Sequence, residues 1–200
     1  GATIQVTGSI DTTEDILVNG LTVGTGLSND SSNAVLGADA FSQATGGTNN
    51  VAVGIRAYKS GSGQGNTAVG YEALRDAAGI TETTAIGRAT FRTDQGGGNV
   101  GVGAYVGVFN TTGYKNVGVG HFSFQANTTG YYNVAVGNRS LRRNTTGNSN
   151  TALGQNAMFN SQIGNENTAV GNSALYHNVS GSTNVAVGHN ALQGNTEGNT

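Results

Sequence analysis

Three histidines are the residues of this chain whose type most readily supports catalysis: His121, His177 and His189. A serine-type triad needs a histidine beside a nucleophile and an acid. His121 and His189 each follow a repeated glycine, but four repeats separate them, about 19 Å at the spacing of stacked strands. We therefore expect surface positions that accept many residue types. The alternative is a ring of three symmetry-related histidines that binds an ion on a trimer axis.

Carboxylates could support glycoside hydrolysis if they were paired. They are sparse and mostly early in the sequence, and after residue 94 only Glu166 and Glu197 follow. Asp11, Glu14 and Asp15 could hold calcium, although a solvated loop is the expected role. We predict no catalytic residue, no cofactor and no metal site, and therefore no enzyme.

Aromatic residues beside asparagine and arginine are the best candidates for binding. Aromatic faces suit sugar stacking, and arginine and asparagine suit hydrogen bonding. The predicted surface or glycan contacts are Tyr131, Tyr132, Tyr114, Arg142 and Arg143. The alternative is that these side chains fill contacts between chains or cover loops.

The composition excludes several classes of protein. The 200 residues include 34 glycines and no proline, cysteine or tryptophan, and the net charge is −2 with 10% charged residues. Collagen needs glycine at every third position with proline. There is no basic stripe for nucleic acid, no polybasic membrane segment, and no apolar run of about 20 residues for membrane insertion. Disulfides and thiolate chemistry are absent.

A five-residue core, Asn-(Thr/Val)-Ala-(Val/Leu/Ile)-Gly, recurs along the chain and decides the fold. The gaps between its final glycines are 17 or 16 residues. Those glycines are Gly37, Gly54, Gly70, Gly87, Gly103, Gly120, Gly137, Gly154, Gly171 and Gly188.

Other columns keep the same register. Asparagine is the first residue of nine of the ten cores, and Thr83 is the exception. Four representative pairs of core asparagine and glycine are Asn50 and Gly54, Asn133 and Gly137, Asn150 and Gly154, and Asn184 and Gly188. A large apolar residue stands four positions after the glycine in all copies but one, where Gly107 stands instead. A second glycine recurs about ten positions after the first.

These columns predict an all-β, parallel β-solenoid of about ten 17-residue coils. Each unit should form a strand, a tight turn at the glycine, a second short strand such as Asn172–Leu175, and a longer turn. Coils about 4.8 Å apart would build a rod roughly 50 Å long. The asparagines should form an internal amide ladder.

A 17-residue coil is thin, and we expect that the large apolar column or the small-residue column packs against other chains. A closed homo-oligomer would cover it, and a trimer is the favoured form.

The core Asn-Val-Ala-Val-Gly, followed by a small residue and a spaced glycine, resembles the head repeat of trimeric autotransporter adhesins of the YadA type. The longer form, Asn-Thr-Ala-Val-Gly-Asn-Ser-Ala-Leu with Asn-Thr-Thr-Gly nearby, is also similar to tail-fibre and virion structural proteins of marine tailed phages. The resemblance implies a trimeric, left-handed parallel β-roll and a place in a virion or on an extracellular cell surface. The adhesin repeat is usually shorter, so the extra residues here should lengthen one loop per coil.

Residues 1–32 lie outside the register, and we expect them to cap or connect the repeat domain of residues 33–200. Ile4, Val6 and Ile10 alternate there, before a cluster at Ile16–Val18. The loop at Asn195–Gly198 precedes a core that would begin just past Thr200, so we expect the natural chain to continue.

Two functions follow from this reading. The first is a structural and adhesive fibre segment that contacts a host surface through a glycan or another receptor. The second is an architectural spacer or decoration fibre that binds no receptor. Ice binding would need a regular threonine column, which the alternation of threonine with valine does not give.

Overall fold

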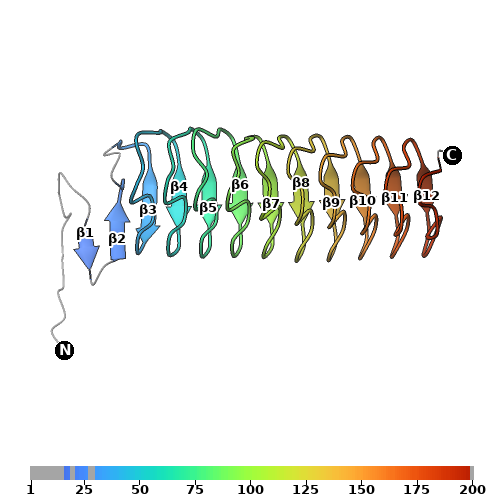
Figure 1. The fold of residues 1–200 in the computed structure, drawn as a ribbon. Coiled ribbons are helices and arrows are strands. Elements are labelled where there is room, and N and C mark those ends of the chain that lie inside the picture. Colours follow the sequence, from blue (N-terminus) through green and yellow to red (C-terminus); the bar gives the residue numbers. More distant parts are fainter. Residues whose placement is uncertain (1–15, 19–20, 27–29, 199–200) are drawn as a thin grey trace, which may run out of the picture.

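The protein is a β-solenoid with its strands in one row. The computed structural model describes residues 16–18, 21–26 and 30–198. All twelve strands belong to one sheet in sequence order (Figure 1). The strands are β1 Ile16–Val18, β2 Leu21–Gly24, β3 Ala34–Gly37, β4 Val51–Val53, β5 Thr67–Val69, β6 Thr84–Ile86, β7 Val100–Val102, β8 Val117–Val119, β9 Val134–Val136, β10 Thr151–Leu153, β11 Thr168–Val170 and β12 Val185–Val187.

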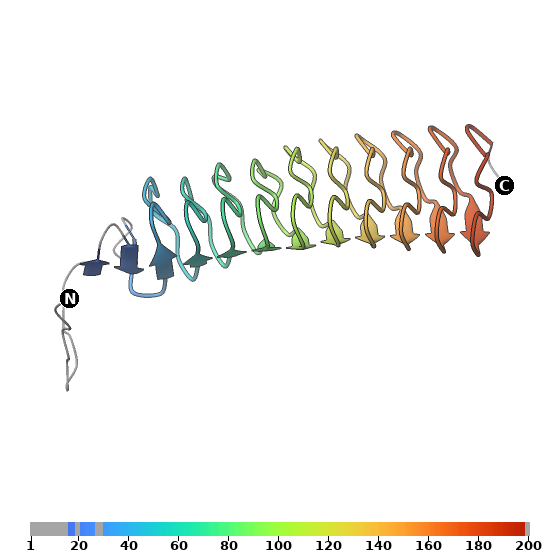
Figure 2. The same ribbon diagram turned by 90° about the horizontal axis from the view of Figure 1, so that it is seen from below.

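From β3 to β12 each strand pairs in parallel with the next, and equivalent residues lie opposite one another. Ala135, for example, is level with Ala152, and Ala152 with Ala169. The predicted stacking of like on like is therefore confirmed. Viewed from below, the strands line one side of the rod, and the turns of the same coils form the other (Figure 2).

The core glycine is required twice over. Gly137 and Gly154 both have φ of 133°, a region that is essentially closed to other residues. A Cβ on Gly154 would lie 2.6 Å from the carbonyl oxygen of Gly171 in the next coil. The turn predicted at this glycine is confirmed, and the close approach of the next backbone is a second reason for glycine.

The core asparagines form the predicted ladder inside the solenoid. Asn150 Nδ2 donates to Asn133 Oδ1 at 3.1 Å and to the carbonyl of Gly164 at 2.8 Å. The backbone N–H of Asn167 donates to Asn150 Oδ1 at 3.0 Å. Each amide thus joins two coils and closes its own coil, which satisfies groups that would be costly to bury unpaired.

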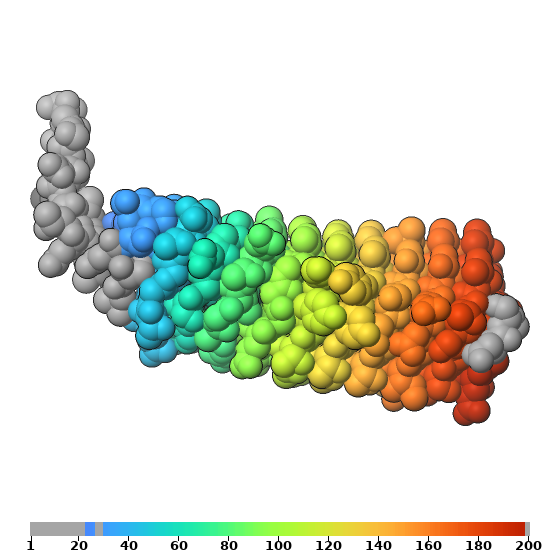
Figure 3. All heavy atoms as spheres, turned by 90° about the horizontal axis from the view of Figure 1, so that it is seen from above, coloured from blue at the N-terminus to red at the C-terminus, as the bar shows by residue number. Residues whose placement is uncertain are grey.

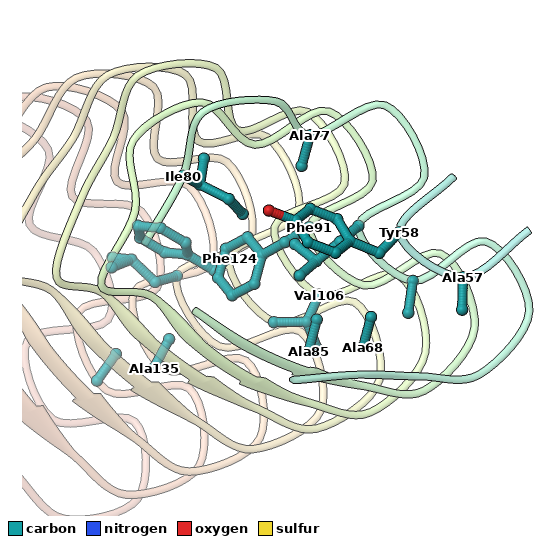
Figure 4. Packing of buried hydrophobic residues seen from close by; sticks show 14 of the residues in the cluster. Ala57, Tyr58, Ala68, Ala77, Ile80, Ala85, Phe91, Val106, Phe124 and Ala135 are labelled. Carbon is teal, nitrogen blue, oxygen red and sulfur yellow. The ribbon is translucent and has the colours of Figure 1, made fainter. Parts of the chain in front are cut away.

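The apolar core lies within the single chain, which corrects the expectation that other chains cover it. The middle residue of each strand from β4 onward is alanine or glycine and points inward, while the two flanking residues point outward. The large apolar column is fully buried in the same coils except at Leu192 in the last coil, which is 41% exposed. The eight buried members, each 0% exposed, are Phe41, Tyr58, Leu74, Phe91, Phe124, Leu141, Met158 and Leu175. Figure 4 shows the rings of Tyr58, Phe91 and Phe124 inside the coils, with Ala68, Ala85 and Ala135 nearby. Alanine on the strand leaves the space that these larger side chains fill.

Two interruptions of the columns are compensated by neighbouring side chains. At Gly107, which replaces the large residue of its coil, a Cβ would lie 2.2 Å from the ring of Phe91. Gly101 replaces the strand alanine of its coil, and a Cβ on Gly101 would lie 2.8 Å from the same Phe91 ring. Phe91 therefore occupies the volume that both glycines leave open.

The expected second strand is absent: Asn172–Leu175 forms turns, and the same is true of the equivalent segments in the other coils. The reason is a left-handed backbone at two positions of each turn, such as Arg139 with φ of 57° and Leu141 with φ of 48°. These residues still bind neighbouring coils. Arg139 N–H donates to the His121 carbonyl of the coil before, and Leu141 N–H to the Ala157 carbonyl of the coil after.

An antiparallel hairpin of β1 and β2 precedes the solenoid. β2 pairs along β3, with Val23 opposite Leu36, and so occupies the hydrogen-bonding edge of the first parallel strand. Ile4, Val6, Ile10, and the acids Asp11, Glu14 and Asp15 lie outside the described residues. Among the residues that are described, no helix is long and apolar enough to span a bilayer.

Candidate functional site

The surface of the rod is a series of bands, one per coil, so that exposed side chains of equivalent positions line up along it (Figure 3). A binding site on such a surface is built from side chains on neighbouring coils. Three groups of side chains stand out: a tyrosine cluster, an arginine–aromatic cluster and an ion-pair network.

The tyrosine cluster unites three of the predicted contact residues at the corner that leads into the strands. The rings of Tyr114 and Tyr131 stack on adjacent coils with centroids 5.0 Å apart and planes 8° from parallel. Tyr132 meets both rings edge-on, at 5.6 and 5.5 Å. Lys115 lies over the Tyr132 ring at 5.4 Å. Tyr132 is 49% exposed, so the cluster presents aromatic surface to solvent.

The other two predicted contact residues, Arg142 and Arg143, belong to an arginine–aromatic cluster on the turn side of the coils. The Arg142 guanidinium lies 5.4 Å from the ring centre of Phe122 and 5.5 Å from that of Phe159. Arg143 lies over the Phe159 ring at 5.5 Å and donates to Asn160 Oδ1 at 3.1 Å. None of these contacts joins this cluster to the tyrosines, so the five predicted residues form two groups.

An ion-pair network near the N-terminal end was not anticipated. Glu72, only 6% exposed, pairs with Arg56 at 3.2 Å, Arg75 at 3.0 Å and Arg92 at 3.9 Å. Burial opposes ionisation of the Glu72 carboxyl, but the hydrogen bonds from Arg75 and Arg56 outweigh it and lower the pKa. Asp39 pairs with Arg56 and Asp76 with Arg75, so three carboxylates balance the three arginines. The arrangement is therefore structural.

A second internal ladder was also missed. Asn127 Nδ2 donates to Asn110 Oδ1 at 2.5 Å, and Asn144 Nδ2 to Asn127 Oδ1 at 2.8 Å. The sequence carries a signal for this ladder, because asparagine recurs at the start of Asn-Thr-Thr-Gly at Asn127 and Asn144 with the spacing of one coil. Asp94 heads this ladder, accepting from Asn110 at 2.6 Å.

The histidines do not come together. His121 packs on Phe122 with ring centroids 3.8 Å apart, and His177 lies against Tyr176. In the described part of the chain no group of three histidines, cysteines or acids could hold a metal ion. A ring of histidines from different chains stays a prediction that a single chain does not test.

The fold and these surfaces define a β-solenoid repeat protein with aromatic and cationic clusters on its outside. No protein-family model, no curated protein and no solved structure matches the chain.

Proposed function

We propose that this protein is a structural and adhesive fibre segment: a homotrimeric, left-handed β-roll, in a phage tail fibre or a cell-surface adhesin, that contacts a host surface. The proposal places it in a virion or on an extracellular surface. The observation that carries it is a stack of ten coils in which each coil is hydrogen-bonded to the next on the strand side and on the turn side. Such a stack suits a rigid spacer that holds binding groups away from its base.

An exposed aliphatic surface supports assembly with further copies of the chain. The outward residues of β3 to β12 form two columns of valine, threonine, isoleucine and leucine, with Ala34 at the start of one, and neither column contains a charged residue. Within them Leu36, Ile86, Val102 and Val136 are 36–42% exposed. We call these two columns the aliphatic face. An apolar stripe along a whole rod favours burial, and a second copy has the same axial spacing, so side chains can match in register.

The tyrosine cluster supports the adhesive part of the proposal. Tyrosine rings stacked on adjacent coils offer large, rigid surfaces with polar hydroxyls, which is the kind of surface that binds a partner at little entropic cost. The second candidate function, an architectural spacer without a receptor, would leave these rings with no role beyond coil-to-coil packing.

Replacement of Val102 and Val136 by lysine tests the assembly. We expect the wild type to have a mass of about 60 kDa by light scattering, three times the 20.1 kDa of one chain, and the double variant to be monomeric. Phe109 and Ile163 are 54% and 52% exposed away from the strands, so the lysine double variant there is the matched control. A monomeric wild type contradicts the trimer. An unchanged mass for V102K/V136K contradicts the aliphatic face as its interface.

Binding to host cells separates the two functions. Adhesion that falls when Tyr131 and Tyr132 are both replaced by alanine, with the circular dichroism unchanged, supports the adhesive fibre. Adhesion absent from wild type and variant alike supports the spacer.

A further inference from the structure

Three arginines near the N-terminal end of the rod belong to an ion-pair network, and three arginines beyond its middle do not. Arg56, Arg75 and Arg92 all pair with Glu72. Three more arginines, Arg139, Arg142 and Arg143, gather on the single coil that follows β9, and no ion pair among the described residues includes any of them. After residue 94 the only acids are Glu166 and Glu197. The coil therefore carries a local positive charge that the chain does not balance.

The central guanidinium of this group is held in place. Arg142 lies between the rings of Phe122, one coil before, and Phe159, one coil after, and its Nε donates to Gln125 Oε1 at 2.9 Å. Among the described residues the Arg142 side chain makes no other hydrogen bond, so its terminal nitrogens remain available to a ligand. Burial, and then the charges of Arg139 and Arg143, lower the pKa of Arg142, which reflects how closely the three cations are placed.

The neighbouring coils add flat aromatic surface. Phe159 and Tyr176 stack with ring centroids 5.1 Å apart and planes 3° from parallel. Arg143 covers Phe159 from the same coil as Arg142, and its hydrogen bond to Asn160 fixes its direction. The result is a cluster of planar guanidinium donors held against aromatic rings, a geometry that suits bidentate binding of a carboxylate or sulfate group.

We propose that Arg139, Arg142 and Arg143 form a binding site for an acidic glycan, whose carboxylate or sulfate group the arginines bind, while the rings of Phe122 and Phe159 hold the Arg142 guanidinium in place. This inference rests on the adhesive function proposed above and names its ligand. A nucleic acid fits less well, because its phosphates would need cations along several coils and here they are confined to one.

Titration calorimetry of the intact chain with defined probes tests the site. The probes are a carboxylated tetragalacturonate, a sulfated heparin tetrasaccharide, neutral maltotetraose and a single-stranded dodecanucleotide. We expect binding of one or both acidic oligosaccharides and a loss of at least about tenfold in affinity for Arg142→Gln, the effect of removing one charge-assisted contact. Arg92 occupies the same position of its own coil but pairs with Glu72, so Arg92→Gln is the matched control and should bind like wild type.

The outcomes are distinct. Equal binding of maltotetraose and the acidic sugars overturns the acidic preference while leaving the adhesive function in place. Tightest binding of the oligonucleotide, or an equal loss for Arg92→Gln and Arg142→Gln, overturns the site. A variant Phe159→Leu that keeps its circular dichroism but weakens binding of the acidic sugars supports the role of this ring in holding Arg142, and unchanged binding of that variant contradicts it. No binding of either acidic oligosaccharide overturns the inference, and host-cell adhesion then tests the fibre by itself.

Discussion

Two features limit which residue each position of this solenoid accepts: the backbone angles at that position and the contact with the next coil. The core glycines show both. Gly154 and Gly188 have similar backbone angles, with φ of 133° and 124°. Their surroundings differ: a Cβ on Gly154 would lie 2.6 Å from the backbone of the next coil, whereas a Cβ on Gly188 would lie 4.0 Å from its nearest atom, the Ala191 Cβ. The two positions therefore separate the cost of the angle from the cost of the contact.

We predict that Gly154→Ala destabilises the 200-residue chain by more than Gly188→Ala. Both changes strain the backbone by about 1–3 kcal/mol, and Gly154→Ala also forces two coils apart. Denaturant unfolding followed by circular dichroism measures both. Equal losses of stability would show that the close approach at Gly154 has no energetic consequence.

Asp94 is a buried carboxyl within a ladder of neutral amides. Burial raises its pKa above the ordinary value of 3.8, against the hydrogen bonds from Asn99, Gly96 and Asn110. The folded state thus favours the protonated form, so the contribution of Asp94 to stability is greatest below the unfolded-state pKa and falls as pH rises toward the folded-state pKa.

We expect the free energy of unfolding of wild type relative to Asp94→Asn to decrease as the pH rises above the ordinary value of 3.8, whatever constant difference the substitution adds. Comparing wild type with Asp94→Asn cancels the effect of the other acids, which titrate alike in both proteins. Glu72 is one of them: its pKa is lowered, so its contribution to stability is lost as the pH falls. Urea unfolding at several pH values measures the difference. A difference that is flat or grows with pH would contradict the raised pKa of Asp94.

At the scale of the element, two amide ladders hold the coils in register. The first runs through the core asparagines, with Thr83 in one coil, where the Asn99 N–H reaches Thr83 Oγ1 at 3.4 Å. The second is interrupted at Ser161, and the buried Ser161 Oγ and Asn144 Oδ1 have no hydrogen-bond partner among the described residues. An unpaired buried polar group costs about 1–3 kcal/mol.

Ser161→Asn should therefore stabilise the protein by roughly 1 kcal/mol or more, because the longer side chain can donate to Asn144 Oδ1 and to the Gly164 carbonyl, as the equivalent asparagines do in their coils.

Asn150→Ala in the first ladder should destabilise the protein by about 3 kcal/mol, since it breaks contacts to Asn133, Gly164 and Asn167. Thermal and denaturant unfolding measure both. If S161N is less stable than wild type while S161A has the stability of wild type, the second ladder has no room for the amide.

What the sequence could predict at this scale was the stacking and the glycine and asparagine columns, because identical residues at a fixed period leave few other arrangements. It misplaced the large column, since Leu141 and its equivalents have left-handed φ and turn inward, and nothing in composition signals that angle for leucine. It named Arg142 and the tyrosines but did not predict the contact of Arg142 with Phe122 or of Glu72 with its arginines, because these depend on which side chains of adjacent coils meet.

At the scale of the whole molecule, the protein is a rod whose length follows from the number of coils and whose outside differs from side to side. The strand side is aliphatic and uncharged, and the turn side carries ion pairs near one end and unpaired arginines nearer the other. A fibre segment needs one surface to assemble and another to bind, and these two surfaces do not compete for the same residues.

Lengthening the rod tests the stacking of coils most directly. Duplication of residues 133–166, two 17-residue units, should extend the particle by roughly 10 Å along its axis and leave its cross-section unchanged. Small-angle X-ray scattering measures both dimensions. An unchanged length with a wider cross-section would contradict the solenoid and every surface inferred from it.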